Sequence, residues 1–196
     1  YERVGLILRP ELVALKSDSQ EASKFEALVN KVVQASDASL ILMSDNPDIL
    51  KAGLHAGSDR KPLLYPATKD NLEAIAGLAK SSSCPVAVKA SNVEELAQLT
   101  AKLTEAGVQD IVLDSGSRTV RQAFEDQVII RSAALVKKFR PLGFPTITFP
   151  GEMTDDLMKE ALIASILIAK YAGIIVLSDF RGESLFPLLV ERMNIY

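Results

Sequence analysis

The chain has 196 residues, of which 48% are hydrophobic and 24% charged, as in an ordinary globular domain large enough to bury a core. Its net charge of −3 gives no electrostatic basis for binding nucleic acid or an anionic membrane. One cysteine, Cys84, excludes an internal disulfide and a four-cysteine iron–sulfur or zinc site, and one histidine, His55, excludes a histidine-rich metal site. We expect Cys84 to be a small buried hydrophobic residue.

The start of the chain, Tyr-Glu-Arg-Val, has no basic segment leading into an apolar core, so it does not resemble a signal peptide. The longest apolar stretch, Ala161–Ala169, is far shorter than the ~20 residues that span a bilayer. The sequence therefore predicts a cytoplasmic protein without membrane association.

Residues 1–9 are ambiguous, because Val4–Leu8 could form a strand. We favour the tail of a helix, since Pro10 is common just after a helix and a first strand at Leu12 makes the later spacing regular. On this interpretation the chain begins inside an element, and the first strand lies upstream of Tyr1.

Short apolar runs recur along the chain at intervals of roughly 23 to 35 residues, the length of a strand–helix unit. The seven runs are Leu12–Lys16, Leu40–Met43, Leu63–Tyr65, Val86–Lys89, Ile111–Asp114, Thr146–Phe149 and Ile174–Leu177. An open doubly wound sheet fits this pattern, but no glycine fingerprint follows any run to mark a nucleotide site. We therefore predict an α/β fold, a single TIM-type (β/α) barrel domain over residues 1–196 with seven strand–helix units present and the first strand missing upstream.

Helix boundaries are marked by capping residues between these runs. The predicted N-terminal signals are Ser23 with Glu26, Asn46 with Pro47, Asp70 with Glu73, Asn92 with Glu95, and Thr154, while Gly107 is predicted to end the helix that begins at Val93.

The helix predicted over 156–172 is apolar on almost its whole circumference. Such a helix is buried on more than one side. It either meets a neighbouring domain or subunit, or fits tightly between two flanking helices.

In a (β/α) barrel, catalytic and ligand-binding residues lie where strands end and loops begin. Polar residues at these ends include Asp45 and Asp70, which we interpret as cap or turn residues. The candidates for a ligand site at the barrel mouth are Lys89, Asp114, Gly116, Arg118, Ser178 and Asp179.

The loop Asp114–Arg118 precedes a helix, and Gly116 allows a close backbone approach to an anion, although the loop is not a P-loop. Lys89 could form a Schiff base, contact a phosphate, or pair with a carboxylate such as Asp114. No Ser/His/Asp set or carboxylate pair is evident, so we predict no catalytic, cofactor-binding or metal-binding residue in this chain.

Five blocks in order resemble the large (gamma) subunit of the corrinoid iron–sulfur protein, from the acetyl-CoA decarbonylase/synthase system. They are Pro-Leu-Leu-Tyr-Pro-Ala-Thr-Lys-Asp-Asn (62–71), Asp-Ile-Val-Leu-Asp-Ser-Gly (110–116), Phe-Arg-Pro-Leu-Gly-Phe-Pro-Thr (139–146), Ile-Ala-Lys-Tyr-Ala-Gly-Ile-Ile-Val-Leu-Ser-Asp (168–179) and Arg-Met-Asn-Ile-Tyr (192–196). The chain departs from the family at Ser115, where proline is frequent, and at Met193, where glutamine is usual.

The resemblance implies a scaffold barrel that is not catalytic, flanked in the complete subunit by domains that hold a [4Fe–4S] cluster and a corrinoid (cobalamin). The complete protein would carry a methyl group from a methyl-tetrahydropterin to acetyl-CoA synthase in one-carbon metabolism. The implied partners are the small subunit, as a heterodimer, and acetyl-CoA synthase and a methyltransferase through the full complex.

Two alternatives stay open. The barrel could be a pterin-binding methyltransferase that uses Asp114 against the guanidine-like edge of a pterin. It could also be a stand-alone paralogue without cofactor domains.

Overall fold

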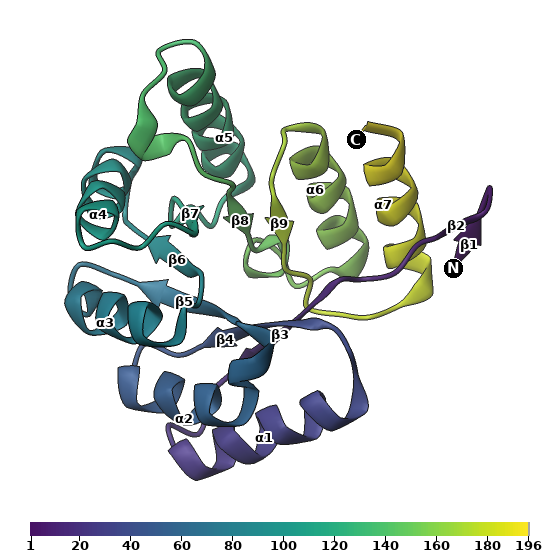
Figure 1. The fold of residues 1–196 in the computed structure, drawn as a ribbon. Coiled ribbons are helices and arrows are strands. Elements are labelled where there is room, and N and C mark those ends of the chain that lie inside the picture. Colours follow the sequence, from purple (N-terminus) through teal and green to yellow (C-terminus); the bar gives the residue numbers. More distant parts are fainter. Residues whose placement is uncertain (196) are drawn as a thin grey trace. The chain divides into compact units, whose positions relative to one another are not determined.

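The computed structural model describes residues 1–195, and Figure 1 shows its elements. The chain divides into two compact units, one formed by Glu11–Leu113 and the other by Tyr1–Pro10 with the chain from Asp114 onward. Tyr196, the last residue of the fifth block quoted above, lies outside the described residues.

Four parallel strands pair in sequence order in the unit Glu11–Leu113, namely β3 (Leu12–Lys16), β4 (Ser39–Met43), β5 (Leu63–Ala67) and β6 (Val86–Lys89). The strand β7 (Ile111–Asp114) follows β6 in the same sheet and ends where the other unit begins. The β4 side chains Leu40, Ile41 and Leu42 are each at most 1% exposed, as expected for strands covered on both faces.

Helices follow these strands and lie along one side of the sheet (Figure 1). They are α1 (Ala22–Ala35), α2 (Pro47–Gly57), α3 (Leu72–Ser82) and α4 (Val93–Glu105), with the short 3₁₀ turn η1 (Ser58–Arg60) after α2. This alternation confirms the first five strand–helix units predicted from the apolar runs, the fifth being completed by α5 (Val120–Leu135).

Two predicted helix starts in this unit are confirmed. Asn46 accepts a hydrogen bond from the backbone N–H of Asp48, and Asn92 accepts one from that of Glu95. The predicted end of α4 is also confirmed, because Gly107 has φ +92° and Val108 N–H donates to the carbonyl of Leu103 at 3.0 Å.

Three predicted N-caps are wrong. Helix α1 begins one residue before Ser23, so Ser23 lies inside the helix and Glu21 takes the cap position. Asn71, and not Asp70, precedes α3, and its side chain accepts a hydrogen bond from Thr68 in the preceding turn. Asp156, and not Thr154, caps helix α6, because its carboxylate accepts from the N–H groups of the first helical turn while Thr154 accepts from Asp156 itself.

The expected helix tail at residues 1–9 is also wrong. β1 (Glu2–Arg3) and β2 (Leu6–Ile7) form an antiparallel hairpin. Val4 and Gly5 join them with φ of +51° and +75°, the left-handed values of a tight two-residue hairpin turn. A valine at such a position is unusual, so the only residue that signals this turn is Gly5.

The chain from Asp114 onward contains the last two predicted strands. They form a short parallel pair, β8 (Ile147–Thr148) and β9 (Ile174–Ile175). Around them are α5, the 3₁₀ turns η2 (Arg140–Leu142) and η3 (Pro150–Glu152), and helices α6 (Leu157–Ala169) and α7 (Gly182–Ile195). Ala123 of α5 packs with Ile163 and Leu167 of α6, and Leu188 of α7 packs with Ala164 and Ile168 of α6.

Helix α6 therefore lies between α5 and α7. A position between two flanking helices was one of the two arrangements expected from its sequence. Its third face is apolar and exposed, because Met158, Leu162 and Ile166 are 68%, 60% and 41% exposed. These residues follow one another at i, i+4 and i+8, so they form one stripe, here called the α6 stripe.

Cys84 is buried, as expected, and carries a free thiol. Among residues 1–195 we find no helix with the length and apolar character needed to cross a bilayer.

Candidate functional site

Asp114 ends strand β7 and is 2% exposed. Its Oδ1 accepts hydrogen bonds from the backbone N–H of Gly116 at 2.8 Å and from the guanidinium of Arg118 at 3.1 Å, and its Oδ2 accepts from Arg118 at 2.9 Å. Gly116 reaches this position with φ +75°, which an L side chain rarely adopts. The N–H group predicted to bind an anion is therefore already donated to a carboxylate.

Arg118 connects this strand end to the next one. Its Nε donates to the carboxylate of Glu152 in η3, and its guanidinium carbon lies 4.9 Å from the centre of the Phe149 ring. The side chain is 23% exposed, so the ion pair with Asp114 is shielded on most sides. The ends of β7 and β8 are thus held together by one guanidinium.

The same loop is fixed to helix α5. The hydroxyl of Ser117 donates to Asp126 at 2.5 Å, and the side-chain amide of Gln122 donates to the other oxygen of Asp126 at 3.0 Å. Asp126 is 3% exposed, so this carboxylate is part of the packed interior of the unit. The loop is therefore rigidly positioned before any ligand arrives.

Ser178 follows strand β9 and is held by Glu160 of α6. Glu160 accepts from the backbone N–H of Ser178 at 2.6 Å and from its hydroxyl at 2.5 Å, and it is itself 4% exposed. Gly151 lies against this pair, since a Cβ there would stand 2.9 Å from Oε1 of Glu160 and 3.0 Å from Cβ of Ser178. Gly151 and Glu152 are neighbours in η3, so this short turn joins the Ser178 pair to the Arg118 pair.

Asp179 is less firmly embedded. Its Oδ1 accepts from the N–H of Phe180 at 2.8 Å, and its Oδ2 lies 2.7 Å from Nε of Arg181, whose side chain is 64% exposed. An ion pair of this kind contributes little to stability.

Lys89 ends strand β6 in the unit Glu11–Leu113 and is half-buried. At the strand ends of that unit the organising side chain is Asn71, which donates to the carbonyls of Asp45 and Pro66 at 3.2 Å and accepts from Thr68. The sequence singled out its neighbours and missed Asn71 itself.

Within the unit that contains Asp114, the structure brings together Asp114, Gly116 and Arg118. The turn η3 connects them to Ser178. Sequence reasoning missed Phe149, Gly151, Glu152 and Glu160. The one available signal was Glu160, the acidic residue of a helix that is apolar on almost its whole circumference. The carboxylates of Asp114 and Glu152 both engage the Arg118 guanidinium, which disfavours a further anion. No group of three or more metal-binding side chains occurs among residues 1–195.

A family model described as CO dehydrogenase/acetyl-CoA synthase delta subunit matches residues 1–196. The chain belongs to this family. It is 39% identical to the corrinoid/iron-sulfur protein large subunit of Moorella thermoacetica and 32% identical to the acetyl-CoA decarbonylase/synthase complex subunit gamma of Methanopyrus kandleri. Both matches cover 100% of the chain, so the predicted resemblance to the large (gamma) subunit is confirmed.

The chain spans 44% of the length of each of these two relatives. Among solved structures it resembles dihydropteroate synthases. The enzyme from Thermus thermophilus in complex with 6HMPPP aligns with a TM-score of 0.72 at 15% identity, over 95% of this chain and 84% of that one. The Yersinia pestis enzyme with a pterine-sulfa conjugate aligns with a TM-score of 0.64 at 15% identity over the same shares. At this identity the likeness shows the fold, and it confirms the predicted TIM-type (β/α) barrel class.

One of these relatives is named as a corrinoid/iron-sulfur protein subunit, which raises the question of whether an iron–sulfur cluster fits this chain. A [4Fe–4S] cluster needs four cysteine thiolates, and the chain has one cysteine, Cys84, which is buried. His55, its one histidine, is exposed and paired with Glu26 at 2.8 Å. These residues do not fit the cluster, and we derive no reaction step through it.

Proposed function

We propose that this chain is the scaffold barrel of a corrinoid iron–sulfur methyl carrier, and that it is not itself catalytic. In the complete protein, other domains would hold the corrinoid and the [4Fe–4S] cluster. That protein would move a methyl group from a methyl-tetrahydropterin to acetyl-CoA synthase. The barrel would supply shape and a contact surface for the small subunit of the corrinoid iron–sulfur protein.

The α6 stripe is the observation that carries this proposal. Met158 and Leu162 are each more than half exposed, although both belong to a helix that already packs against α5 and α7. Exposed apolar side chains in a continuous stripe mark protein–protein contact surfaces. Because the matched relatives are named as subunits, a partner subunit is the occupant we assign to the stripe.

The strand-end residues support a structural role. Asp114 has both carboxylate oxygens engaged by Arg118, and the Ser178 hydroxyl is donated to Glu160. A catalytic carboxylate or hydroxyl would need an open position toward a substrate, and each of these groups is already bound inside its own unit.

Size-exclusion chromatography of the chain mixed with the small subunit tests the proposal. We expect the two to co-elute, and we expect Met158→Glu with Leu162→Glu to weaken the complex by at least about tenfold, because two carboxylates would be buried in an apolar contact. Val136→Glu is the matched control, since Val136 is 78% exposed and lies outside the stripe. If the folded chain elutes alone, the scaffold role is wrong.

A second function, a pterin-binding methyltransferase-like barrel, is favoured by one observation. Asp114 is a buried carboxylate at a strand end, where a (β/α) barrel places ligand-binding groups. A pterin edge would have to replace Arg118 on that carboxylate. The dihydropteroate synthases that share the fold were solved with pterin-related ligands, but this likeness supports the fold alone.

Calorimetry with methyltetrahydrofolate separates the two functions. The pterin-binding function predicts heat that disappears in Asp114→Ala and persists in Asp179→Ala, a more exposed carboxylate. No heat from the folded chain would remove this alternative. A native reading frame without flanking cofactor domains would instead favour the stand-alone paralogue.

A further inference from the structure

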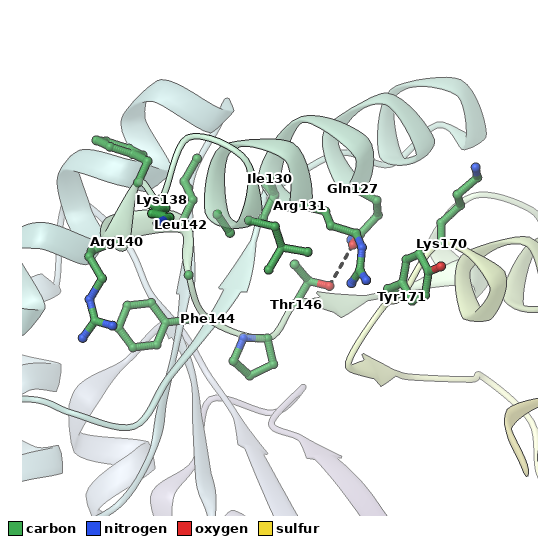
Figure 2. Close-up of a pocket in the computed structure, with 15 residues that line it drawn as sticks. Gln127, Ile130, Arg131, Lys138, Arg140, Leu142, Phe144, Thr146, Lys170 and Tyr171 are labelled. Carbon is green, nitrogen blue, oxygen red and sulfur yellow. Dashed lines mark hydrogen bonds between the residues drawn. The ribbon is translucent and has the colours of Figure 1, made fainter. Parts of the chain in front are cut away.

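A groove of about 530 Å³ lies in the unit that contains Asp114. It is lined by residues of α5, by the η2 segment and by the residues that follow α6. Figure 2 shows its lining residues. The segment 139–146, one of the blocks that carried the family resemblance, forms most of one wall. Neither the strand-end residues nor the α6 stripe uses this groove.

Four cationic side chains line the groove: Arg131, Lys138, Arg140 and Lys170. No aspartate or glutamate is among the described residues that line it. Within residues 1–195 none of the four cations has an ion pair with a carboxylate. A chain with a net charge of −3 thus concentrates unneutralised positive charge in one place.

The cations stand at both ends of the groove. Arg140 and Phe144 lie near one end, and Arg131, Lys170 and Tyr171 lie near the other (Figure 2). The guanidinium carbon of Arg131 is 3.5 Å from the centre of the Tyr171 ring, so this arginine is held in place by a cation–π contact. Positive charge at two separated ends suits an extended anion better than a compact one.

The floor between the two ends is fixed. The hydroxyl of Thr146 donates to the side-chain oxygen of Gln127 at 2.9 Å, and these residues are 5% and 6% exposed (Figure 2). Two apolar side chains that line the groove, Phe139 and Leu135, are 45% and 62% exposed. The groove therefore has a rigid base and open apolar walls.

Lys138 has φ +52°, a left-handed conformation that non-glycine residues seldom adopt. Glycine would remove the strain at this turn, yet the position carries a cation that lines the groove.

We propose that this groove binds an extended acidic peptide segment of a partner protein, with carboxylates at the Arg140 and Arg131 ends and an apolar side chain against the exposed Phe139 and Leu135. The exposure of these apolar residues, and the positive charges at both ends of the groove, favour an extended segment over a small enclosed ligand. This proposal does not depend on the scaffold role of the α6 stripe.

Isothermal titration calorimetry with unlabelled peptides tests the proposal on the 196-residue chain. The probe is acetyl-Glu-Phe-Glu-Glu-Leu-Glu-amide, and its matched control has glutamine in place of every glutamate. We expect the acidic probe to bind with a Kd below about 100 µM at low salt, with at least about tenfold weakening near 0.5 M salt. The glutamine peptide is expected to bind at least about tenfold more weakly.

Variants locate the binding. Arg131→Gln with Arg140→Gln should weaken it by at least about tenfold, whereas Lys137→Gln should leave it unchanged, because Lys137 is exposed beside Lys138 but does not line the groove. Lys138→Gly removes the cation and relieves the positive φ together, so it should weaken binding without lowering the thermal midpoint of unfolding. This variant keeps the test valid if the double variant fails to fold.

Three results would overturn the proposal. They are the absence of heat with about 1 mM acidic peptide, equal binding of the glutamine peptide, and displacement of the acidic peptide by an equimolar amount of inorganic pyrophosphate. The last result would show a site for compact anions instead of a peptide groove.

Discussion

Arg118 donates from its guanidinium to both carboxylate oxygens of Asp114, four residues earlier in the chain, at 3.1 and 2.9 Å. The same side chain reaches Glu152, 34 residues later, so it joins two strand ends that are distant in sequence. A bidentate contact of this kind fixes orientation as well as distance.

Replacing Arg118 with methionine should lower the free energy of unfolding by about 2 kcal/mol, because the buried carboxylate of Asp114 loses its charged partner. Urea denaturation measures the loss. Arg121→Gln is the matched control, since Arg121 pairs with Glu125 on the same part of the chain but is 89% exposed, and we expect no resolvable change. In Asp114→Asn with Arg118→Met the two losses should not add, and full additivity would contradict the coupling.

Glu160→Gln should destabilise the chain by about 2 kcal/mol in the same measurement. Both carboxylate oxygens accept hydrogen bonds from Ser178, and an amide can offer only one acceptor while its NH₂ group faces a donor. Ser178→Ala, which keeps the backbone contact, should cost about 1 kcal/mol. A Glu160→Gln variant as stable as the native chain would show that Glu160 does not hold this strand end.

The pKa of the Glu95 carboxyl lies below its ordinary value, because the hydroxyl and the backbone N–H of Ser91 both donate to its charged form. Since the folded pKa is lowered, the contribution to stability is present above the unfolded value near 4.5 and is lost as the pH falls. Ser91→Ala should raise the pKa in an NMR titration of the carboxyl carbon. An unchanged pKa would assign the effect to the backbone contact alone.

Burial raises the pKa of the Cys84 thiol, which opposes formation of the reactive thiolate. We expect the thiol to react with a disulfide reagent at pH 8 at least about 100-fold more slowly in the folded chain than in urea. Because the folded pKa is raised, the neutral thiol favours folding below the unfolded value near 9.0, and this contribution is lost as the pH rises through the folded pKa. Rapid labelling of the folded chain would contradict the buried position.

The sequence predicted the strands from β3 onward well, because they are apolar runs, such as Leu40–Met43, that are buried in a covered sheet. It did not predict the exposed pair β1 and β2. It predicted the caps at Asn46 and Asn92, whose side chains bond to the first turn of their helices, but it missed Asp156, which bonds in the same way. It failed at the Val4–Gly5 turn, where valine is unusual in a left-handed conformation, and at Asn71, whose side chain bonds across a loop to Asp45.

The candidate site was predictable only in part. Asp114, Gly116 and Arg118 are close in sequence, so their contact could be anticipated from one loop. Glu152 and Glu160 come from a turn and a helix far along the chain, and their contacts with Arg118 and Ser178 depend on how β8 and β9 pair. The basic groove was missed because only the fold brings the three cations of residues 131–140 beside Lys170.

Cys84 is the one cysteine of the chain, and it is hidden. New thiols introduced at exposed positions such as Lys51 in one unit and Val136 in the other would therefore be modified without interference from the native residue. Fluorophores attached at such a pair would report the separation of the two units in solution, and how a partner subunit alters it.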